Sequence, residues 1–566
     1  MCSHFDGRSS CLANRWRLAV LPISLALAGW NCRALADEEL ISLSLEQLMD
    51  VTVSSASRFE QKISKVASAV TVITRDEIQQ HGWRTLAEAL RSVPGFYIHN
   101  DRNYDYIGMR GFARPQDFNS RILLLLDDQR INDPLYDQAK VGSEQLLDLD
   151  LVERIEVVRG PGSSVYGGNA IFGVINVITR TARQVDGFEA AAGWASHHTR
   201  SGRLSFGGRS ENGFELLASF SGLHSEGPSL YFPELDSPAT NNGRTSGTDF
   251  DYNERFFGRL SFGGWRLTAA ASQRRKGSPN GSYGSNFNDP QNSIVDSQAF
   301  VDLSYQQPLT DSSEIQGRVY WSRYAYDWTS NYNTPPILNH DQAQANWWGS
   351  ELKLLASWSP RNRLVSGIEY ESSYHLNQWN YDPSPANEYF RDQRRSQRFG
   401  VFLQNDFQWT DAINLSLGAR VDKVGNTRVQ ISPRLGVVYR SSPETIWKMQ
   451  YGTAFRAPNT YESHYRFPGS QIDNPDLQPE KITTYEAGVA HYFSRRTRLS
   501  ATLYHYKISQ LIDQISDPGN GGLLKYTNSD PVNSAGVELE AEHLFQNGAR
   551  LRTNLDLSQT RDSSGH

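Results

Sequence analysis

The sequence predicts an antiparallel β-barrel in a membrane, preceded by a smaller α/β domain. From about residue 187 onward, helical periodicity disappears and segments of roughly ten residues alternate apolar and polar side chains. We count about seventeen such segments, separated by short gaps that alternate with long polar ones, as in outer-membrane barrels. The segments lie near residues 187, 201, 213, 254, 264, 296, 313, 347, 362, 395, 411, 430, 445, 481, 496, 533 and 548, and the long gaps at 224–253, 274–295, 326–346, 374–394, 454–480 and 510–532.

Composition agrees with a barrel but does not by itself select one. Hydrophobic residues make up 38% of the 566 residues and the mean hydropathy is −0.55, which excludes a bundle of apolar membrane helices. The chain has 26 Tyr, 13 Trp and 44 Gly, as expected for strands that show half of their residues to lipid. A large soluble β-protein would have the same composition, so both classes remain open at this point.

The N-terminus favours the membrane barrel. Arg8, Arg15 and Arg17 precede an apolar run at 18–30, and Ala-Leu-Ala at 34–36 supplies a cleavage pattern. The run is too short to span a bilayer as a helix. We therefore predict that residues 1–36 are a signal peptide and that the chain is exported.

Removal of this peptide changes which chemistry is available. The three cysteines all lie within it, which excludes disulfides and thiol chemistry in the mature chain; they are Cys2, Cys11 and Cys32. The peptide also holds four Arg and one Asp, so its loss moves the net charge from −6 to −9. An acidic chain of this kind argues against nucleic acid as a partner.

Residues 147–180 organise the α/β domain. Ile155 and Val157 alternate with polar or outward positions in a short predicted strand, and residues 174–178 form a second, more apolar one. Between them, Gly-Pro-Gly at 160–162 predicts a turn, so we expect a tightly turned hairpin. Five glycines keep this unit close to other backbone: Gly160, Gly162, Gly167, Gly168 and Gly173.

This stretch, ERIEVVRGPGSSVYGGNAIFGVINVITR, resembles the closing part of the plug domain of TonB-dependent outer-membrane receptors. Phe172 departs from the family, which usually has a small residue there. The segments 107–112 and 122–126 resemble the plug's RGF and LLLIDG runs, although Asp128 replaces the usual glycine. Further matches lie in the barrel at 455–458, 474–480 and 533–540.

The resemblance implies a domain order and a nominal barrel of 22 strands whose lumen the plug fills. We expect a periplasmic segment at 37–57, a plug at 58–182 and a transmembrane barrel at 183–566. Our count is seventeen, and residues 562–566 do not form the family's terminal aromatic strand, so either the count is low, the sequence is a fragment or the gene is truncated. We expect a fragment that lacks about five strands.

Two helices are predicted inside the plug. Thr74 and Glu77 form a capping box that opens the first helix after a strand at 69–73. The second helix covers 85–91, with apolar residues on one face, and stops at Pro94-Gly95.

The segment after the signal peptide has two interpretations. Its alternating β-branched residues predict an extended strand with no nearby packed partner, which could add itself to the sheet of another protein. The alternative is an ordinary edge strand of the plug. Its position resembles the family's TonB box, which favours docking to TonB through Asp50, Val51, Thr52, Val53 and Ser54.

The resemblance also implies that plug arginines face barrel glutamates. Arg110 and Arg159 would then pair with Glu480 and Glu538 and lock the plug, and we expect Arg159 to face Glu480 in particular. Alternatively, these are solvated charges on the wall of the lumen.

Cargo residues are harder to predict. His464, with His99 as a second ligand, occupies a position where haem receptors of this family have an iron ligand, but loop histidines are common. Trp328 and Tyr332 suit capture of a bulky, partly apolar chelate, or belong to the interfacial girdle of any barrel.

The leading hypothesis is active transport of a scarce iron chelate across the bacterial outer membrane, with haem or cobalamin as alternative cargoes. TonB and its inner-membrane complex would pull on the N-terminal box, and the receptor would be monomeric. A passive porin or adhesin barrel is the alternative from another class, but neither needs a plug. No catalytic constellation or metal-ligand spacing is present, which argues against a soluble secreted enzyme and predicts no cofactor.

Overall fold

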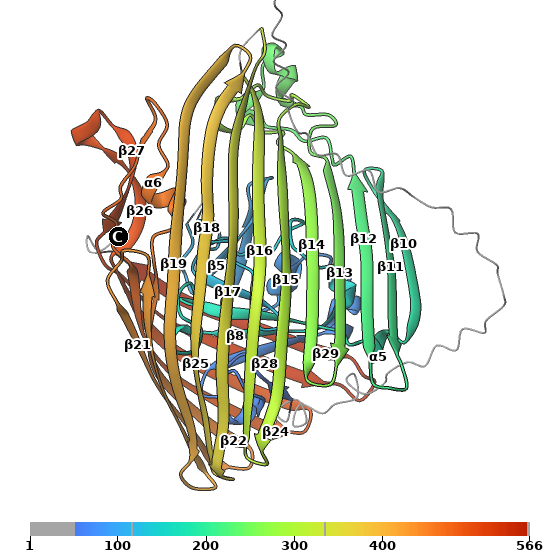
Figure 1. The fold of residues 1–566 in the computed structure, drawn as a ribbon, viewed down its shortest axis with the longest axis vertical. Helices are drawn as coiled ribbons and strands as arrows, with labels where there is room; N and C mark the ends of the chain where they lie inside the picture. Colours follow the sequence, from blue (N-terminus) through green and yellow to red (C-terminus); the bar gives the residue numbers. More distant parts are fainter. Residues whose placement is uncertain (1–50, 115–116, 333–334, 563–566) are drawn as a thin grey trace, which may run out of the picture.

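A computed structural model describes residues 51–114, 117–332 and 335–562, so the predicted signal peptide and Asp50 lie outside the described residues. Seventeen antiparallel strands form one curved sheet in chain order, with β10 and β29 at its edges (Figure 1). Its strands are β10 (Gly187–Ala195), β11 (Thr199–Arg209), β12 (Glu215–Ser225), β13 (Asp251–Phe262), β14 (Trp265–Gly277), β15 (Ser293–Thr310), β16 (Ser313–Tyr332), β17 (Ile337–Ser359), β18 (Asn362–Pro383), β19 (Ala386–Gln408), β20 (Ile413–Val424), β21 (Gln430–Ser442), β22 (Thr445–Arg456), β24 (Glu480–Ser494), β25 (Thr497–Ser509), β28 (Val532–Leu544) and β29 (Arg550–Arg561).

The predicted strand count is confirmed, and each predicted segment corresponds to one strand. The connections at one end of the sheet are short turns, such as 263–264 and 360–361. The other end carries four long connections, which hold short helices and a small three-stranded sheet: 226–250, 278–292, 457–479 and 510–531. In outer-membrane barrels the long loops are extracellular, which orients the molecule.

Two of the predicted long loops are wrong. Residues 326–346 and 374–394 belong almost entirely to β16–β19, which run for 20 to 23 residues and rise above their neighbours (Figure 1). The aromatic and polar residues read as loop composition in fact alternate between the two faces of these strands. Where a strand extends beyond the lipid, neither of its faces is apolar. The alternation of apolar and polar residues that predicts a strand is therefore missing there.

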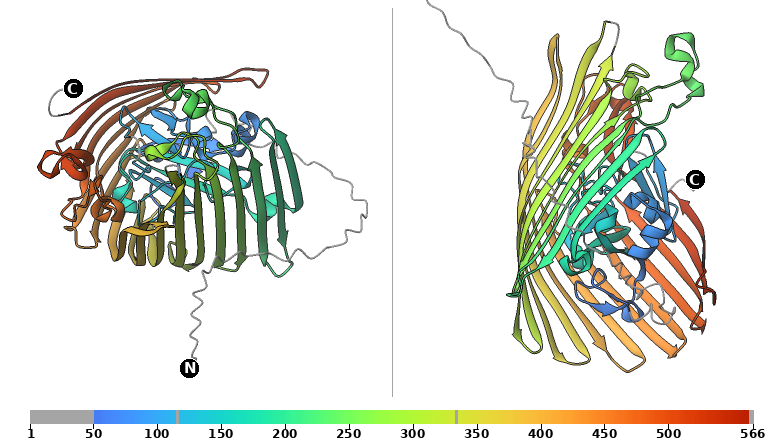
Figure 2. Two further views of the ribbon diagram at one scale, coloured as in Figure 1. Left: turned by 90° about the horizontal axis from the view of Figure 1, so that it is seen from above. Right: turned by 90° about the vertical axis from the view of Figure 1, so that its right-hand side faces the viewer.

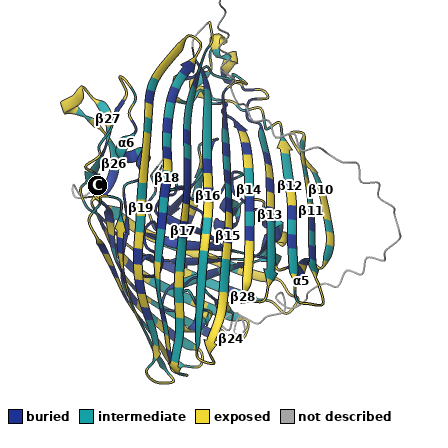
Figure 3. Ribbon diagram, viewed as in Figure 1, coloured by how far each residue is buried: buried dark blue, intermediate teal, exposed yellow. Residues whose placement is uncertain are grey.

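The outward face of the sheet is apolar along its middle. Exposed large residues include Phe188, Leu204, Leu417 and Leu503, at 86, 65, 56 and 60% exposure. Figure 3 shows the resulting alternation of buried and exposed positions along each strand. This pattern fits lipid outside and a filled lumen inside. No helix among the described residues is long and apolar enough to cross a membrane.

The N-terminal domain lies inside the curve of the barrel wall, as Figure 2 shows from above. Its centre is a mixed sheet in the order β3-β8-β9-β6-β7, in which β6 and β9 are parallel. The sheet comprises β3 (Ala69–Thr74), β8 (Val152–Arg159), β9 (Gly173–Thr179), β6 (Ile122–Leu126) and β7 (Gln129–Arg130); two hairpins accompany it, β1 (Thr52–Val53) with β2 (Gln61–Lys62) and β4 (Phe96–Asn100) with β5 (Asp105–Met109).

Both predicted plug helices are confirmed. Thr74 caps the N-terminus of helix α2 (Arg75–His81): its side-chain oxygen accepts from the backbone amide of Glu77. In turn, the carboxylate of Glu77 accepts from the backbone amide of Thr74. Helix α3 (Leu86–Leu90) has the same capping box at Thr85, and four of its residues are buried against the sheet. A third short helix, α5 (Ala182–Val185), leads into β10.

The prediction of a tightly turned hairpin is confirmed for the strand pairing but wrong for the turn. Strands β8 and β9 pair antiparallel, but residues 160–172 between them are not a tight turn. They contain helix α4 (Ser163–Tyr166), which packs against β19, β20 and β22 of the barrel. Phe172 is buried there, with its ring 5.3 Å from Phe112 and 5.8 Å from Tyr506, so a large residue fits.

Glycine is required at the start of β9. A Cβ on Gly173 would lie 2.6 Å from the carbonyl oxygen of Val158, so the backbone of β8 would have to move. We expect Gly173→Ala to destabilise the plug by about 1–3 kcal/mol, because the overlap is with backbone. Limited proteolysis of the plug in the intact protein measures this.

Gly317→Ala is the matched control, since a Cβ there meets open space in β16. Equal protease resistance of the two variants would contradict the close approach of β8 and β9.

Candidate functional site: the plug–barrel contact and the outer mouth

Arginines of the plug meet buried carboxylates on one stretch of barrel wall. Glu538, on β28, accepts from Arg110 Nε at 2.8 Å and from Arg159 Nη1 at 2.6 Å. Arg110 Nη1 also reaches Glu486 at 2.5 Å, and Arg159 Nη2 reaches Glu540 at 2.7 Å. All of these groups are buried except Glu540, so each charge is compensated mainly by its partner.

Sequence analysis placed these four residues in one network but assigned one pair wrongly. We expected Arg159 to face Glu480, but both of its carboxylate partners, Glu538 and Glu540, lie on β28. Glu480 instead binds Arg121 of the plug at 2.5 Å and Arg456 of β22 at 2.9 Å. Neither arginine had been identified as a site residue from the sequence.

Glu480 also joins the outer loops to the plug. Arg456 makes two bonds of 2.8 and 2.9 Å to Glu462, on the short outer helix α6 (Thr460–His464). The amide of Ile512, in the loop strand β26 (Leu511–Asp517), donates to Glu480 at 2.7 Å. One buried carboxylate therefore contacts the barrel wall, one outer loop and the plug, and it reaches a second outer loop through Arg456.

A second contact lies on the opposite part of the wall. Arg58 pairs with Glu351 of β17 and, at 2.5 Å, with Glu369 of β18. Glu369 is shared with Arg420, which lies 2.8 Å from Asp422 and donates to the carbonyl of Val165 in α4. Nothing in the sequence pattern had singled out Arg58, since a lone arginine after a strand carries no signal of its partner.

The predicted TonB box is packed in this structure. Thr52 and Val53 pair with Lys62 and Gln61, and Val53 is fully buried, so the expectation of a strand without a packed partner is wrong. The geometry is that of the alternative, an edge strand of the plug. Docking to TonB through this segment stays a prediction, and it requires release of the strand.

A single carboxylate holds the end of this segment. Glu156 lies in the middle of β8 and accepts from the amides of Ser54 and Ser55 at 3.1 and 3.0 Å and from the Ser55 hydroxyl at 2.5 Å. Its other oxygen binds Arg154 at 2.8 Å. Since Arg159 is also on β8, the N-terminal segment and the barrel contact are attached to the same strand.

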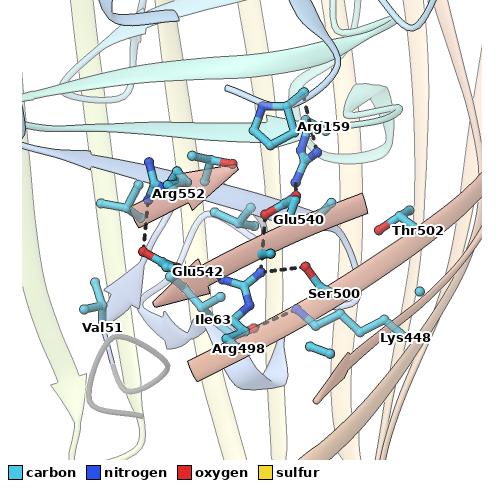
Figure 4. A pocket seen from close by; sticks show the side chains of 18 of the residues that line it. Val51, Ile63, Arg159, Lys448, Arg498, Ser500, Thr502, Glu540, Glu542 and Arg552 are labelled. Atoms are coloured by element: carbon cyan, nitrogen blue, oxygen red, sulfur yellow. Dashed lines mark hydrogen bonds and ion pairs between the residues drawn. The ribbon is translucent and has the colours of Figure 1, made fainter. Parts of the chain in front are cut away.

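A cavity of about 450 Å³ separates the segment from the barrel wall (Figure 4). Val51, Thr52 and Ile63 line one side, and strands β22, β24, β25, β28 and β29 line the other. At its roof, Glu540 is bound by Arg159 and, at 3.5 Å, by Arg498. Lys448 reaches across to the carbonyl of Ile63 at 3.0 Å.

Tyrosines fill the outer mouth. Tyr136, on the outward side of the plug, has ring centroids 5.3 Å from Tyr461 of α6, 6.2 Å from Tyr324 and 6.1 Å from Tyr326 of β16. Phe118 of the plug completes the cluster at 5.0 Å. We call these five residues the mouth cluster. It brings plug, wall and outer loop together, and we had not predicted it.

The predicted cargo residues are dispersed. Trp328 and Tyr332 lie on β16 rather than in a loop, and Trp328 stands edge-on to Tyr283 at 5.1 Å. His99, on β4, stacks on Tyr106, whereas His464 ends α6, where burial and then Arg394 lower its pKa. The two histidines thus have different neighbours, and the described residues contain no group of three His, Cys, Asp or Glu placed to hold a metal ion.

Comparison with known proteins gives two family matches. A family model described as "TonB dependent receptor-like, beta-barrel" matches residues 231–565, and one described as "TonB-dependent Receptor Plug Domain" matches 62–174. Among curated proteins, the vitamin B12 transporter BtuB of Vibrio cholerae is 27% identical over 92% of this chain and 79% of its own length. BtuB of Vibrio vulnificus is 25% identical over 82% of this chain and 71% of its own length.

Solved structures share the fold. The ferric yersiniabactin uptake receptor FyuA of Yersinia pestis superposes with a TM-score of 0.69 at 18% identity, covering 90% of this chain and 80% of its own. The siderophore receptor PiuA of Acinetobacter baumannii gives 0.70 at 15% identity, over 92 and 82% of the two chains.

Loss of Glu538 should loosen the plug. Glu538→Ala leaves Arg110 and Arg159 buried with one partner each, at a cost of about 3–5 kcal/mol. We expect earlier protease cleavage of the plug in urea while the barrel stays folded. Glu254→Ala, an exposed outward carboxylate on β13, is the control. Unchanged cleavage in Glu538→Ala would show that these pairs do not hold the plug.

Proposed function

The chain belongs to the TonB-dependent receptor family, and we propose that its cargo is a bulky iron chelate of the siderophore kind. Members of this family are transporters of the outer membrane rather than enzymes, and they import small molecules with the help of TonB.

The mouth cluster is the observation that carries the proposal. Its five aromatic rings belong to the plug, β16 and α6, so a ligand bound among them would touch the wall, an outer loop and the plug together. Aromatic faces with hydroxyl groups suit chelates that are partly apolar and carry oxygen donors around the metal. Asp341 of β17 adds a carboxylate that accepts from Tyr465 at 3.2 Å.

Cargo in the mouth would act on the plug through Glu480. Tyr461 and Glu462 are neighbours in α6, so movement of the helix toward cargo moves the Glu462–Arg456 bonds. Arg456 shares Glu480 with Arg121 of the plug, and Arg121 also binds Asp117, one residue before Phe118 of the mouth cluster. This gives the plug two connections to a bound chelate.

Energy would enter at the other end. TonB is the expected partner of residues 50–54, of which the structure describes 51–54. Tension on that segment would first break the β1–β2 pairing and the Glu156 bonds, then load β8 and the pairs of Arg159. Because the segment borders the cavity of Figure 4, its release would also open that cavity toward the periplasm.

Cobalamin is the second candidate, supported by a different observation. The curated relatives described above are named as vitamin B12 transporters and match nearly the whole chain. Haem, the third cargo that the sequence suggested, would rely on His99 and His464, which do not share neighbours here.

One uptake experiment separates these cargoes. Cells that depend on this receptor are given labelled ferric catecholate, ferric hydroxamate, cyanocobalamin or haemin. We expect uptake of a ferric chelate, and expect Tyr136→Ala to weaken its binding about tenfold or more, as removal of a central aromatic does. Uptake of cyanocobalamin alone would overturn the iron proposal in favour of the second candidate.

The same cells test the energy source. Deletion of residues 50–56 and collapse of the proton gradient should each abolish uptake but leave surface binding intact. Tyr231→Ala, an exposed outer-loop tyrosine outside the mouth cluster, is the control for Tyr136→Ala. Uptake that persists after both treatments would support a passive barrel instead.

A further inference from the structure

One carboxylate at the outer mouth lies among aromatic rings and has no basic partner. Asp341, on β17, is half-buried, and its Oδ2 accepts from the hydroxyl of Tyr465 at 3.2 Å. Building on the iron-chelate cargo proposed above, we propose that the rings around Asp341 bind an ammonium group of that chelate. The cargo is then a ferric complex with a positive charge, such as a hydroxamate that carries a free amine.

Strand register places aromatic and amide groups on both sides of Asp341. Asp341 faces the lumen, since Ala343 on the same face of β17 is buried. It pairs with Trp328 of β16 on one side and with Asn380 of β18 on the other, and residues directly opposite each other face the same side of a sheet. The Asn380 amide donates to the Tyr465 hydroxyl at 3.4 Å, so Tyr465 is bonded to both β17 and β18.

The mouth cluster extends this aromatic surface. The Tyr465 ring lies 4.7 Å from that of Tyr461, which lies 5.3 Å from Tyr136 of the plug, and Tyr136 lies 6.1 Å from Tyr326. Burial raises the pKa of Tyr136 and of Tyr465, and the charge of Asp341 raises the pKa of both further. The carboxylate is therefore close to rings of the loop and the plug. We use the name Asp341 site for Asp341, Tyr326, Trp328, Tyr461 and Tyr465.

The protein does not neutralise the charge of Asp341. No basic residue among those described forms an ion pair with it. Two cations near the mouth are each bound by an acid of their own: Lys140 by Asp133 at 3.4 Å and Arg394 by Asp392 at 3.0 Å. The negative charge of Asp341 is therefore left for a ligand.

A second acid adds to this charge. Asp382, further out on β18, is buried and accepts from the Asn339 amide at 2.8 Å and from the Tyr389 hydroxyl at 2.7 Å. Both partners are uncharged, so the charge of Asp382 is not cancelled either. This part of the lumen wall therefore attracts cations.

An organic cation is the ligand that this arrangement selects. The faces of Tyr and Trp rings attract ammonium groups, and the attraction grows when water is displaced. A metal ion such as Ca²⁺ takes six or more oxygen ligands, and the described residues contain no group of three His, Cys, Asp or Glu placed to hold one. The Asp341 site therefore fits a protonated amine on an apolar chain.

This preference distinguishes between classes of ferric chelate. Three hydroxamate groups neutralise a ferric ion, so a ferric trihydroxamate with an amine is a cation. Three catecholates leave the complex strongly negative, and Asp341 and Asp382 would repel it. The inference thus narrows the proposed cargo to amine-bearing hydroxamates.

The test compares two chelates that differ by one charge. One is a linear ferric trihydroxamate that ends in a primary amine, and the other is the same complex with the amine acetylated. Binding to the purified receptor in detergent is measured by quenching of tryptophan fluorescence. We expect the parent to bind the amine form about tenfold or more tightly than the acetylated form. Asp341→Asn should reduce this preference to about twofold or less and leave binding of the acetylated form unchanged.

Asp392→Asn is the matched control. It removes another carboxylate from the same part of the wall and changes the net charge by the same amount, but Asp392 is already paired with Arg394. This variant should keep the preference of the parent. Equal melting temperatures of the two variants and the parent show that all three fold.

Two results would overturn the inference and leave the iron cargo in place. The first is equal binding of the two chelates by the parent, and the second is an unchanged preference in Asp341→Asn. If the parent binds neither chelate, the iron proposal itself is in question, and choline then tests the Asp341 site alone by saturation-transfer NMR. Choline binding that weakens in Asp341→Asn but not in Asp392→Asn supports the cation site independently of iron. Equal choline binding by the parent and Asp341→Asn overturns it.

Discussion

The buried pairing of plug arginines with barrel carboxylates is the interaction on which the rest of the structure depends. The apolar core of the plug continues into side chains of the wall, such as Phe257, Phe300 and Ile482, and exposing that contact when the plug moves costs free energy in proportion to its area. Charge pairs behave differently: they hold while water is excluded and exchange their partners for water once it enters. Glu538 on β28 and Glu480 on β24 are each bound by two arginines. Both strands also line the cavity of Figure 4.

The two ends of the plug are connected to this contact in different ways. Toward the outside, Glu480 receives Arg456, and through it α6 and the mouth cluster. Toward the periplasm, Glu156 fixes the N-terminal segment to the strand that carries Arg159. Cargo and tension therefore act on two separate charged contacts of the same plug, which gives a physical basis for needing both.

Much of the fold follows from sequence, because it depends on local patterns. Apolar alternation identified all seventeen strands, and the capping boxes at Thr74 and Thr85 identified two helices. The lengths of β16–β19 could not be predicted from sequence, because the parts of these strands above the lipid do not alternate apolar with polar residues. The residues 326–346 were misread for this reason.

The charge partners could not be predicted in the same way. Arg121 and Glu480 are 359 positions apart, and only the packing of plug in barrel decides which carboxylate an arginine meets. Arg456 carried a usable signal, because it lies within the run 455–458 that resembles the family's barrel sequence. Arg58 and Tyr136 carried no such signal, because their partners are known only once the plug is packed inside the barrel.

A disulfide between plug and wall would test the central claim most directly. Ala67 follows the N-terminal segment, and a Cβ on Gly436 of β21 would lie 2.7 Å from its own, so Ala67→Cys with Gly436→Cys can be bridged after a small shift. The three native cysteines all lie in the predicted signal peptide, so the pair would stand alone in the mature chain.

Once the bonds of Glu156 to Ser54 and Ser55 have broken, the bridge would stop tension on residue 51 before it passes along the chain to β3 and so to β8. Our account predicts that oxidised cells bind cargo normally but do not take it up, and that a reductant restores uptake. Full uptake by a completely oxidised receptor would contradict it, because cargo would then pass while the strand that carries Arg159 is still held.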